Sequence, residues 1–355
     1  MPSAPLPASS PAGPIDFGEG GRSMKAILLA GLAVAVVSLG EAACAQPAKG
    51  VSPKELTGVW TNAALTQLQR PAGLPLVVDE VRARAIAASN PMVRRAAAET
   101  EATDPSEGAG EATDSIQGHN AFWLDPGSSL GRVNGEYRTS WIVEPEDGRL
   151  PLTEAGRQAS RAAALRRDRQ DPEGPEDLSP NDRCLIGSRG MGGPGMLNNI
   201  YNSNYQIVQT PGAVAIMVEM VHDVRVIPLF ADKASAQAGH GPAALQRWLG
   251  DSVGWWEGDT LVVETVHVNP QQGTFGPIFL SSKGRVVERF RRVSPEQIAY
   301  SFEVEDDHYY TRPWRAEMSL NAIGGPIYEY ACHEGNYAIA GVLGGARAAE
   351  AASGP

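Results

Sequence analysis

The sequence has few cysteines and histidines, and it lacks the short motifs of several enzyme classes. Its 355 residues include three cysteines and six histidines. It contains no haem-attachment Cys-x-x-Cys-His, no Gly-x-Ser-x-Gly serine elbow and no dinucleotide fingerprint. The histidines show neither His-x-His nor HExxH spacing, and the glycine-rich stretch Gly187–Gly195 lacks the Lys-Ser/Thr ending of a phosphate loop. We therefore expect no cofactor and no metal.

Basic runs are also missing. The formal net charge is −11 at pH 7, whereas a nucleic-acid-binding surface needs clustered lysine and arginine. We expect no nucleic-acid partner. The one long apolar run, residues 26–40, is shorter than the roughly 20 residues that cross a membrane, so we expect no membrane span.

The same apolar run predicts export. It follows Met24 and precedes the small-x-small pattern Ala43-Cys44-Ala45, which is typical of a signal peptide. We expect cleavage after Ala45, a periplasmic or secreted mature protein, and a true start at Met24, so that residues 1–45 are an upstream extension plus signal peptide. Lipidation of Cys44 is the less favoured alternative, because Glu41 occupies a position where a leucine-like residue is normally required.

Two cysteines remain after cleavage, Cys184 and Cys332. An exported chain with an even pair of cysteines is suited to carry one disulfide. Two separate buried thiols are the alternative. Both interpretations stay open at the level of sequence.

Most of the second half of the chain reads as β-strand. Runs of β-branched and aromatic residues alternate with short turns rich in Gly, Pro, Asp and Asn. Short connections favour antiparallel neighbours, and a meander of many strands must close or pack to remove its edges. We predict a mainly β fold, an antiparallel meander closed into a barrel or strongly curved sheet, with flanking N-terminal helices and a short C-terminal helix. The expected strands are 55–65, 136–143, 204–210, 213–221, 254–256, 260–268, 284–293, 298–306, 312–322 and 326–332.

Composition divides the mature chain into two parts. Residues 46–135 are expected to form a mixed α/β decoration with an acidic loop. Residues 136–355 are expected to form the barrel-like domain, with a helical insertion near 153–170. Asp79 is suited to cap a helix that ends at Asn90.

Several stretches resemble a family of exported bacterial proteins whose function is uncharacterised. They include YNSNYQIVQTPG, EMVHDVRVIPL, GWWEGDTLVVET and YEYACHEGNY, and the resemblance extends over most of the chain from residue 137. It implies export but no reaction. The strand order and the opening GVW also resemble the calycin-like barrels, which implies an interior that holds a small apolar ligand.

The stretch VEMVHDVRVIPL (218–229) contains the densest group of ionisable side chains. In a continuous strand, Glu219, Asp223 and Arg225 share one face and His222 lies on the other, apolar face. A bulge near His222 would break this parity. The side chains then form either a solvated, paired face or the wall of a cavity in which His222 acts as general acid or base.

The remaining candidates are aromatic and amide side chains. Tyr205 or Tyr330 is suited to donate to a developing oxyanion, and His333, after the expected strand 326–332, is a second acid–base candidate. A structural corner is the alternative there. The glycine-rich stretch Gly187–Gly195 is expected to be a flexible lid or a passage over a barrel mouth. The residues after it offer further hydrogen-bonding and stacking groups. The predicted ligand-binding residues are Tyr201, Asn202, Asn204, Arg225 and Tyr330.

These observations favour an exported, cofactor-independent enzyme that performs lyase, isomerase or hydrolase-type acid–base chemistry. Its substrate would be a small neutral molecule, aromatic or terpenoid-like, bound in the barrel, with His222, Glu219, Asp223, His333 and Tyr205 as catalytic candidates. The alternative is a periplasmic binding or carrier protein with the same cavity and no chemistry. A structural envelope protein with a filled core is a third interpretation. Oligomeric state and substrate identity do not follow from the sequence.

Overall fold

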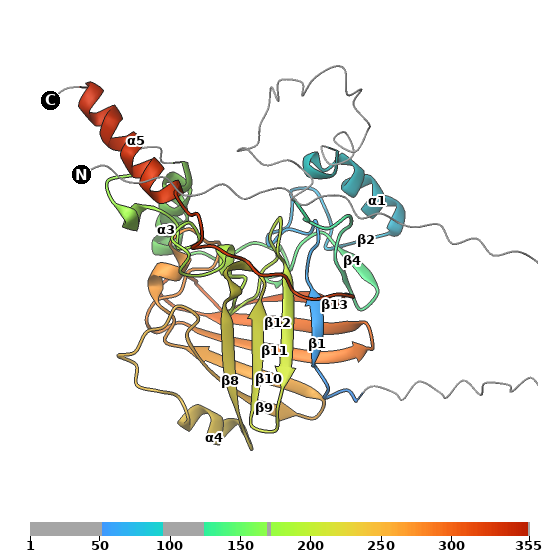
Figure 1. The fold of residues 1–355 in the computed structure, drawn as a ribbon. Coiled ribbons are helices and arrows are strands. Elements are labelled where there is room, and N and C mark those ends of the chain that lie inside the picture. Colours follow the sequence, from blue (N-terminus) through green and yellow to red (C-terminus); the bar gives the residue numbers. More distant parts are fainter. Residues whose placement is uncertain (1–51, 95–123, 169–171, 354–355) are drawn as a thin grey trace, which may run out of the picture. The chain divides into compact units, whose positions relative to one another are not determined.

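The β-branched and aromatic runs form one large sheet that closes on itself (Figure 1). The computed structural model describes residues 52–94, 124–168 and 172–353. Nine strands form the closed ring, which confirms the predicted mainly β barrel. They are β1 (Gly58–Thr61), β6 (Asn204–Gln209), β7 (Ala213–Val218), β8 (Val224–Phe230), β9 (Asp251–Glu257), β10 (Thr260–Val266), β11 (Arg285–Ser294), β12 (Gln297–Glu305) and β13 (Trp314–Ala322).

The short strand β1 closes the ring, because it pairs with β6 on one side and β13 on the other. Trp60 is opposite Tyr205 in one pair and opposite Ala322 in the other. The closing strand therefore comes from the part of the chain expected to be an N-terminal decoration. A further strand, β5 (Ile142–Glu144), pairs with the beginning of β13 at Arg315 and Ala316, whereas β1 pairs with its end.

The ring is antiparallel except at one pair. β8 and β9 are parallel, with Leu229 opposite Gly254. Their connection carries helix α4 (Lys233–Ala238), whereas β9 and β10 are joined by a tight turn at Gly258, whose φ of 59° suits glycine. The expected meander is therefore a mixed barrel.

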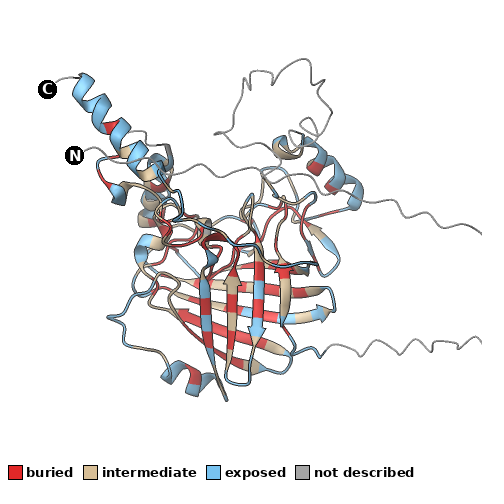
Figure 2. Ribbon diagram, viewed as in Figure 1, coloured by how far each residue is buried: buried red, intermediate tan, exposed pale blue. Residues whose placement is uncertain are grey.

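Alternation along the strands produces the core. In β12, every second residue from Ile298 to Val304 is buried, and Figure 2 shows the same buried stripes on neighbouring strands. Aromatic rings stack inside the barrel: the Tyr300 centroid lies 4.8 Å from that of Phe290 and 5.8 Å from that of Phe302. Packing of this kind excludes water from the barrel wall.

The glycine-rich stretch enters the barrel instead of lying over it as a flexible lid, so that expectation is wrong. Met191 to Leu197 are all buried, and Met191 and Met196 belong to the main hydrophobic core. Gly193 has a φ of +89°, and a Cβ there would lie 2.7 Å from the Arg225 guanidinium carbon. Only glycine permits this close approach.

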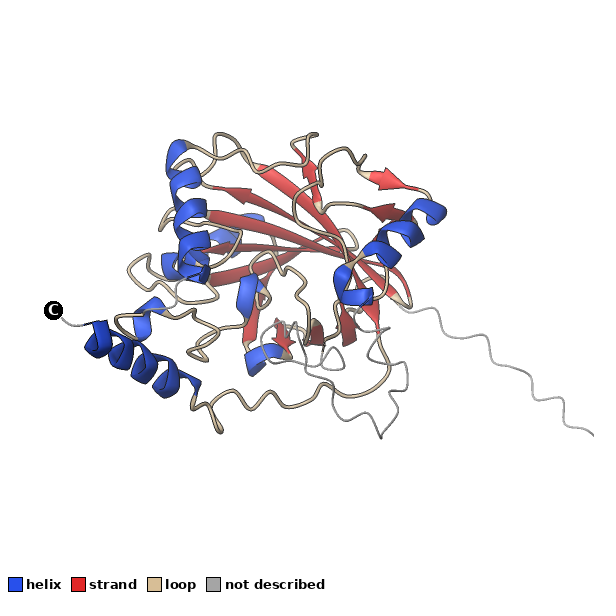
Figure 3. Cartoon of the chain, turned by 90° about the horizontal axis from the view of Figure 1, so that it is seen from above, coloured by secondary structure: helices blue, strands red, loops and turns tan. Residues whose placement is uncertain are grey.

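Helices and a second, three-stranded sheet lie outside the ring of strands (Figure 3). The predicted helix after Asp79 is confirmed, since the Asp79 side chain accepts the Arg82 N–H at 2.8 Å. The elements are α1 (Glu80–Ser89), α3 (Glu154–Asp168) and α5 (Ala338–Ser353), the short helices η2 (Pro175–Asp177), η3 (Ser188–Gly190), η4 (Met220–His222) and η5 (Pro270–Thr274), and the sheet strands β2 (Val77–Val78), β4 (Glu136–Arg138) and β3 (Arg132–Val133).

One expected strand is absent from the described residues. Residues 326–332 have no ladder partner, so Tyr328, Tyr330 and Cys332 do not share the face of a strand. Side chains of other segments hold this stretch instead. The expected signal peptide and the acidic loop of residues 101–118 lie outside the described residues.

Candidate functional site

The stretch 218–229 is two strands and a turn, not one continuous strand. β7 ends at Val218, and Val221 and His222 have φ values of 59° and 46°. The Val218 N–H donates to the Asp223 carbonyl at 2.9 Å and closes the turn. Side chains therefore do not alternate between two faces from Glu219 to Asp223, and each ionisable side chain contacts different residues.

Arg225 points into the barrel and pairs with Glu288 of β11. The guanidinium is 3% exposed and the carboxylate 0%, and two hydrogen bonds join them. Burial acts to lower the pKa of Arg225, but the Glu288 charge raises it. The Tyr300 hydroxyl donates to Glu288 at 2.7 Å, and Glu288 also accepts the Gly195 N–H at 3.3 Å. The predicted ligand-binding residue Arg225 thus holds the inserted loop.

Tyr205 is also inside the barrel. It is fully buried, and its hydroxyl accepts a hydrogen bond from Asn62 at 3.2 Å. Burial raises the pKa of the Tyr205 hydroxyl, so it stays protonated. Like Arg225, it contributes to a polar network around the inserted loop.

Glu219 holds the C-terminal segment onto the barrel rim. Its buried carboxylate accepts the Asn204 amide at 2.5 Å and the Tyr328 N–H at 3.2 Å. The amide nitrogen of Asn204, a residue predicted to contact a ligand, therefore donates to Glu219. Asn202, another predicted ligand-binding residue, lies just before it with a φ of 53°.

His222 and Asp223 belong to the same turn but contact different segments. His222 is exposed, and its Nδ1 donates to the Tyr330 carbonyl at 3.1 Å. Asp223 is partly buried and accepts the Gly187 N–H at 2.6 Å. Burial raises the pKa of Asp223 to about 6, although that hydrogen bond and His222 oppose the shift.

A disulfide joins the two segments that meet above this turn. Cys184 and Cys332 are bonded, with 5.8 Å between their Cα atoms, which decides between the two interpretations of the pair. The side chain of Asn336 donates to the Asp182 carbonyl at 3.1 Å and reinforces the junction. His333, the second predicted acid–base residue, is exposed beside the disulfide.

Two adjoining hollows, which we call the mouth groove, follow this junction. The first has a volume of about 410 Å³ and the second of about 720 Å³. The first hollow is lined by residues 177–182, 186–188 and 199–201 together with Arg166, Arg167 and residues between 272 and 276, and the second mainly by residues between 329 and 342. Cys332 itself lines the second hollow. The residues shared by both hollows are Leu178, Asn181, Asp182, Tyr201 and Val342.

The centre of the mouth groove combines two tyrosines with one carboxyl group, Asp182. Tyr201 and Tyr330 line it, and burial raises the pKa of both hydroxyls, so both remain neutral hydrogen-bonding groups. In the first hollow, the Asn199 amide donates to the Ser188 hydroxyl at 2.7 Å. Such a surface can accommodate a ring and bond its oxygen atoms.

Two of the residues predicted from the sequence, Tyr201 and Tyr330, line the mouth groove together. Outside it, predicted residues also meet in two pairs, Asn204 with Glu219 and His222 with the Tyr330 carbonyl. His222, His333 and Tyr205 line neither hollow of the groove. Asn181, Asp182 and Ser188 were missed as site residues. Their one signal was proximity in sequence to Cys184, and it becomes informative only when the disulfide partner is known.

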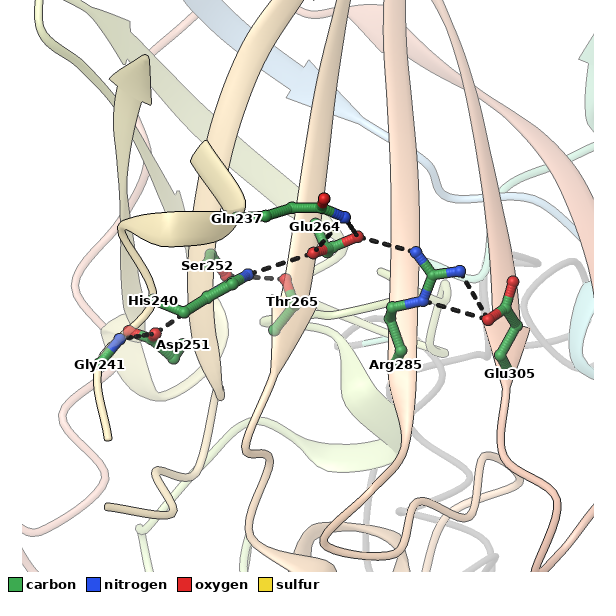
Figure 4. A network of polar contacts seen from close by, with 9 residues as sticks. All are labelled: Gln237, His240, Gly241, Asp251, Ser252, Glu264, Thr265, Arg285 and Glu305. Carbon is green, nitrogen blue, oxygen red and sulfur yellow. Dashed lines mark hydrogen bonds and ion pairs between the residues drawn. The ribbon is translucent and has the colours of Figure 1, made fainter. Parts of the chain in front are cut away.

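A second polar network lies outside the barrel, where α4 covers β9 and β10 (Figure 4). His240 Nδ1 lies 3.0 Å from Asp251, and its Nε2 lies 3.3 Å from Glu264. Each ring nitrogen therefore faces a carboxyl oxygen. Burial acts to raise the pKa of Glu264, but hydrogen bonds from Arg285 and Gln237 hold it below its usual value. The network fixes α4 against the barrel.

Within the described ranges, no three His, Cys, Asp or Glu side chains are grouped to hold a metal ion. Across those same ranges, the helices are too short or too polar to cross a membrane. Comparisons with protein-family models, curated proteins and solved structures find no match to this chain. Function is therefore inferred from the residues of the site.

Proposed function

We propose that the protein binds a small, neutral, ring-bearing molecule in the mouth groove and acts as a binding or carrier protein. The observation that carries the proposal is the meeting of two hollows at Tyr201, with Leu178 and Val342 beside it. Their volumes lie within the roughly 300–1,000 Å³ usual for small-molecule sites. Because residues 191–197 fill the barrel, we place the ligand at its mouth.

The charge distribution supports a neutral ligand. Arg166 and Arg167 line the outer end of the first hollow, and Glu329 and Glu334 line the second. Between these ends lie apolar and neutral polar side chains and the carboxyl groups of Asp177 and Asp182, which already accept hydrogen bonds from the Glu173 and Ser179 N–H groups and lie outside the buried core. An ion placed there would lose hydration without a buried counter-charge, which is costly. A neutral ring loses little hydration, and its oxygen atoms have the Asn199 and Tyr330 groups as partners.

The test is a binding titration with two probes, 1-naphthol and α-terpineol, followed by calorimetry. We expect saturable binding to the wild type and at least about tenfold weaker binding to Tyr201→Ala, equivalent to about 1.4 kcal/mol. Tyr328→Ala is the matched control, because Tyr328 is 72% exposed and does not line the groove. Absence of saturable binding for both probes, or equal losses in the two variants, would overturn the proposal.

Acid–base catalysis is the second candidate, and one observation favours it. Asp223, whose pKa is about 6, accepts the N–H of Gly187, and Gly187 lines the groove. A carboxyl group with this pKa is suited to transfer protons near neutral pH. Conversion of a bound molecule that stops in Asp223→Asn would support an enzyme, with Glu219 and His222 on the same turn as positioning groups. Conversion that continues in Asp223→Asn would remove Asp223 from the chemistry.

We also propose that the protein works in an oxidising compartment. The Cys184–Cys332 disulfide supports this location, since such bonds persist mainly outside the cytosol. Export through the signal peptide and membership of the exported family remain predictions from the sequence. Mass spectrometry of the secreted or periplasmic fraction, with a mature N-terminus after Ala45 as the expected result, tests the export route.

A further inference from the structure

Four neutral polar residues form a lateral row across the strands that close the barrel. In the register of the sheet, Gln297 of β12 is opposite Asn321 of β13. Asn321 is opposite Thr61 of β1, and Thr61 is opposite Asn204 of β6. Lateral neighbours in a sheet point to the same side, at a spacing of about 4.8 Å. Since Trp60 and Tyr205 point inward, the row faces outward.

This row lines a separate hollow of about 850 Å³, which we call the rim cleft. The opposite wall comes from the loop before β3 and from the small sheet, and it includes Ser128, Ser129 and Tyr137. The guanidinium of Arg132 lies over the Tyr137 ring, 4.9 Å from its centroid. The rim cleft shares no lining residue with the mouth groove.

The row retains hydrogen-bonding capacity toward the cleft. The Gln297 amide donates to Asn321 at 2.9 Å, and the Asn204 amide donates to Glu219. Within the described parts of the chain, no protein donor bonds the side-chain oxygens of Gln297 and Asn204. Asn321 has one weak acceptor for its amide nitrogen, Ser319 Oγ at 3.5 Å. The row thus offers the cleft spaced acceptors and a donor, all uncharged.

We propose that the rim cleft is a second binding site, which takes a neutral saccharide. Sugar hydroxyls both donate and accept, so they match a row that presents amide oxygens and an amide nitrogen. An anion is disfavoured because Asp125 and Glu296 line the cleft, while Arg132, the one cation among its described lining residues, already bonds the Gly135 carbonyl. An apolar ligand would leave the row without partners. Binding here does not depend on the ligand of the mouth groove.

The test uses the full chain and four probes: maltotriose, cellotriose, N,N′,N″-triacetylchitotriose and triglycine. Saturation-transfer NMR and calorimetry measure binding, and circular dichroism checks folding. We expect one trisaccharide to bind saturably and triglycine to bind more weakly. Asn321→Leu and Gln297→Met, which keep side-chain size but remove hydrogen-bonding groups, should each weaken it by about tenfold or more.

Tyr201→Ala, in the mouth groove, is the control and should leave trisaccharide binding unchanged. The assignment would be overturned if none of the three trisaccharides bound saturably, or if triglycine bound more tightly than every trisaccharide. It would also be overturned if both row variants kept the affinity of the wild type. Because the 1-naphthol titration measures the mouth groove separately, either site can fail without affecting the conclusion about the other.

Discussion

Replacing Glu288 by glutamine should destabilise the barrel more than any surface substitution. The change leaves the Arg225 guanidinium, which is 3% exposed, without a counter-charge inside the barrel. Removing one partner of a buried ion pair costs about 3–5 kcal/mol. Glutamine keeps a carbonyl oxygen for the Tyr300 hydroxyl, so the loss reports mainly the unpaired charge. We expect a decrease of that size in the free energy of unfolding, a large part of the roughly 5–15 kcal/mol of a typical domain.

The matched control is the double variant Arg225→Met/Glu288→Gln. It removes the buried charge altogether, and replacing an ion pair by neutral groups is often close to neutral in stability. The double variant should therefore be more stable than Glu288→Gln alone. Urea unfolding at low salt is the suitable assay, because guanidinium chloride would screen the charges.

Two results would refute this reasoning. A loss below about 1 kcal/mol in Glu288→Gln would mean that water reaches the pair, as at surface sites. A double variant that is less stable than the single variant would mean that the side chains contribute through packing, and that Arg225 does not depend on Glu288 for its charge.

Two further predictions concern the mouth groove. The pKa of Asp223 is raised from 3.8 to about 6, so the folded protein holds this proton more tightly than the unfolded chain. Stability should therefore fall as pH rises, by about 3 kcal/mol over the whole titration and by about 2 kcal/mol between pH 4 and 6. Asp223→Asn should lose this decrease in urea unfolding measured across that range, and an unchanged decrease would assign it to other groups. Cys184→Ser/Cys332→Ser should raise hydrogen exchange in residues 326–342, since the disulfide and a few hydrogen bonds hold that segment, while amides of β11 and β12 keep their protection. Equal exchange in the variant and the wild type would show that the remaining contacts suffice.

Much of the barrel could be predicted from local pattern. The alternation in β12 and the Gly258 turn each specify their own element, and the closed ring follows from the need to cover strand edges. The parallel pair β8–β9 could not be predicted, because the choice depends on how α4 packs against Val253 and Trp255. Residues 326–332 show the reverse case: a good β-pattern that lacks a partner strand.

The site was less predictable because residues that are far apart in the sequence form it together. Tyr201 and Tyr330 were recognised by residue type, but only the Cys184–Cys332 bond places them in one groove. The sequence left open whether the stretch 218–229 is one continuous strand or bulges near His222. The alternation of side chains does break there, at the left-handed residues Val221 and His222. A histidine or valine with positive φ carries no reliable local signal. The partner of Arg225, Glu288, lies 63 residues further along the chain.

The most direct test of the central claim is the affinity of 1-naphthol for the wild type and for Tyr201→Ala, with Tyr328→Ala beside them. If the mouth groove binds small neutral rings, the wild type and Tyr328→Ala bind equally and Tyr201→Ala binds at least about tenfold more weakly. Equal affinity of all three proteins, or no saturable binding to the wild type, would contradict the claim.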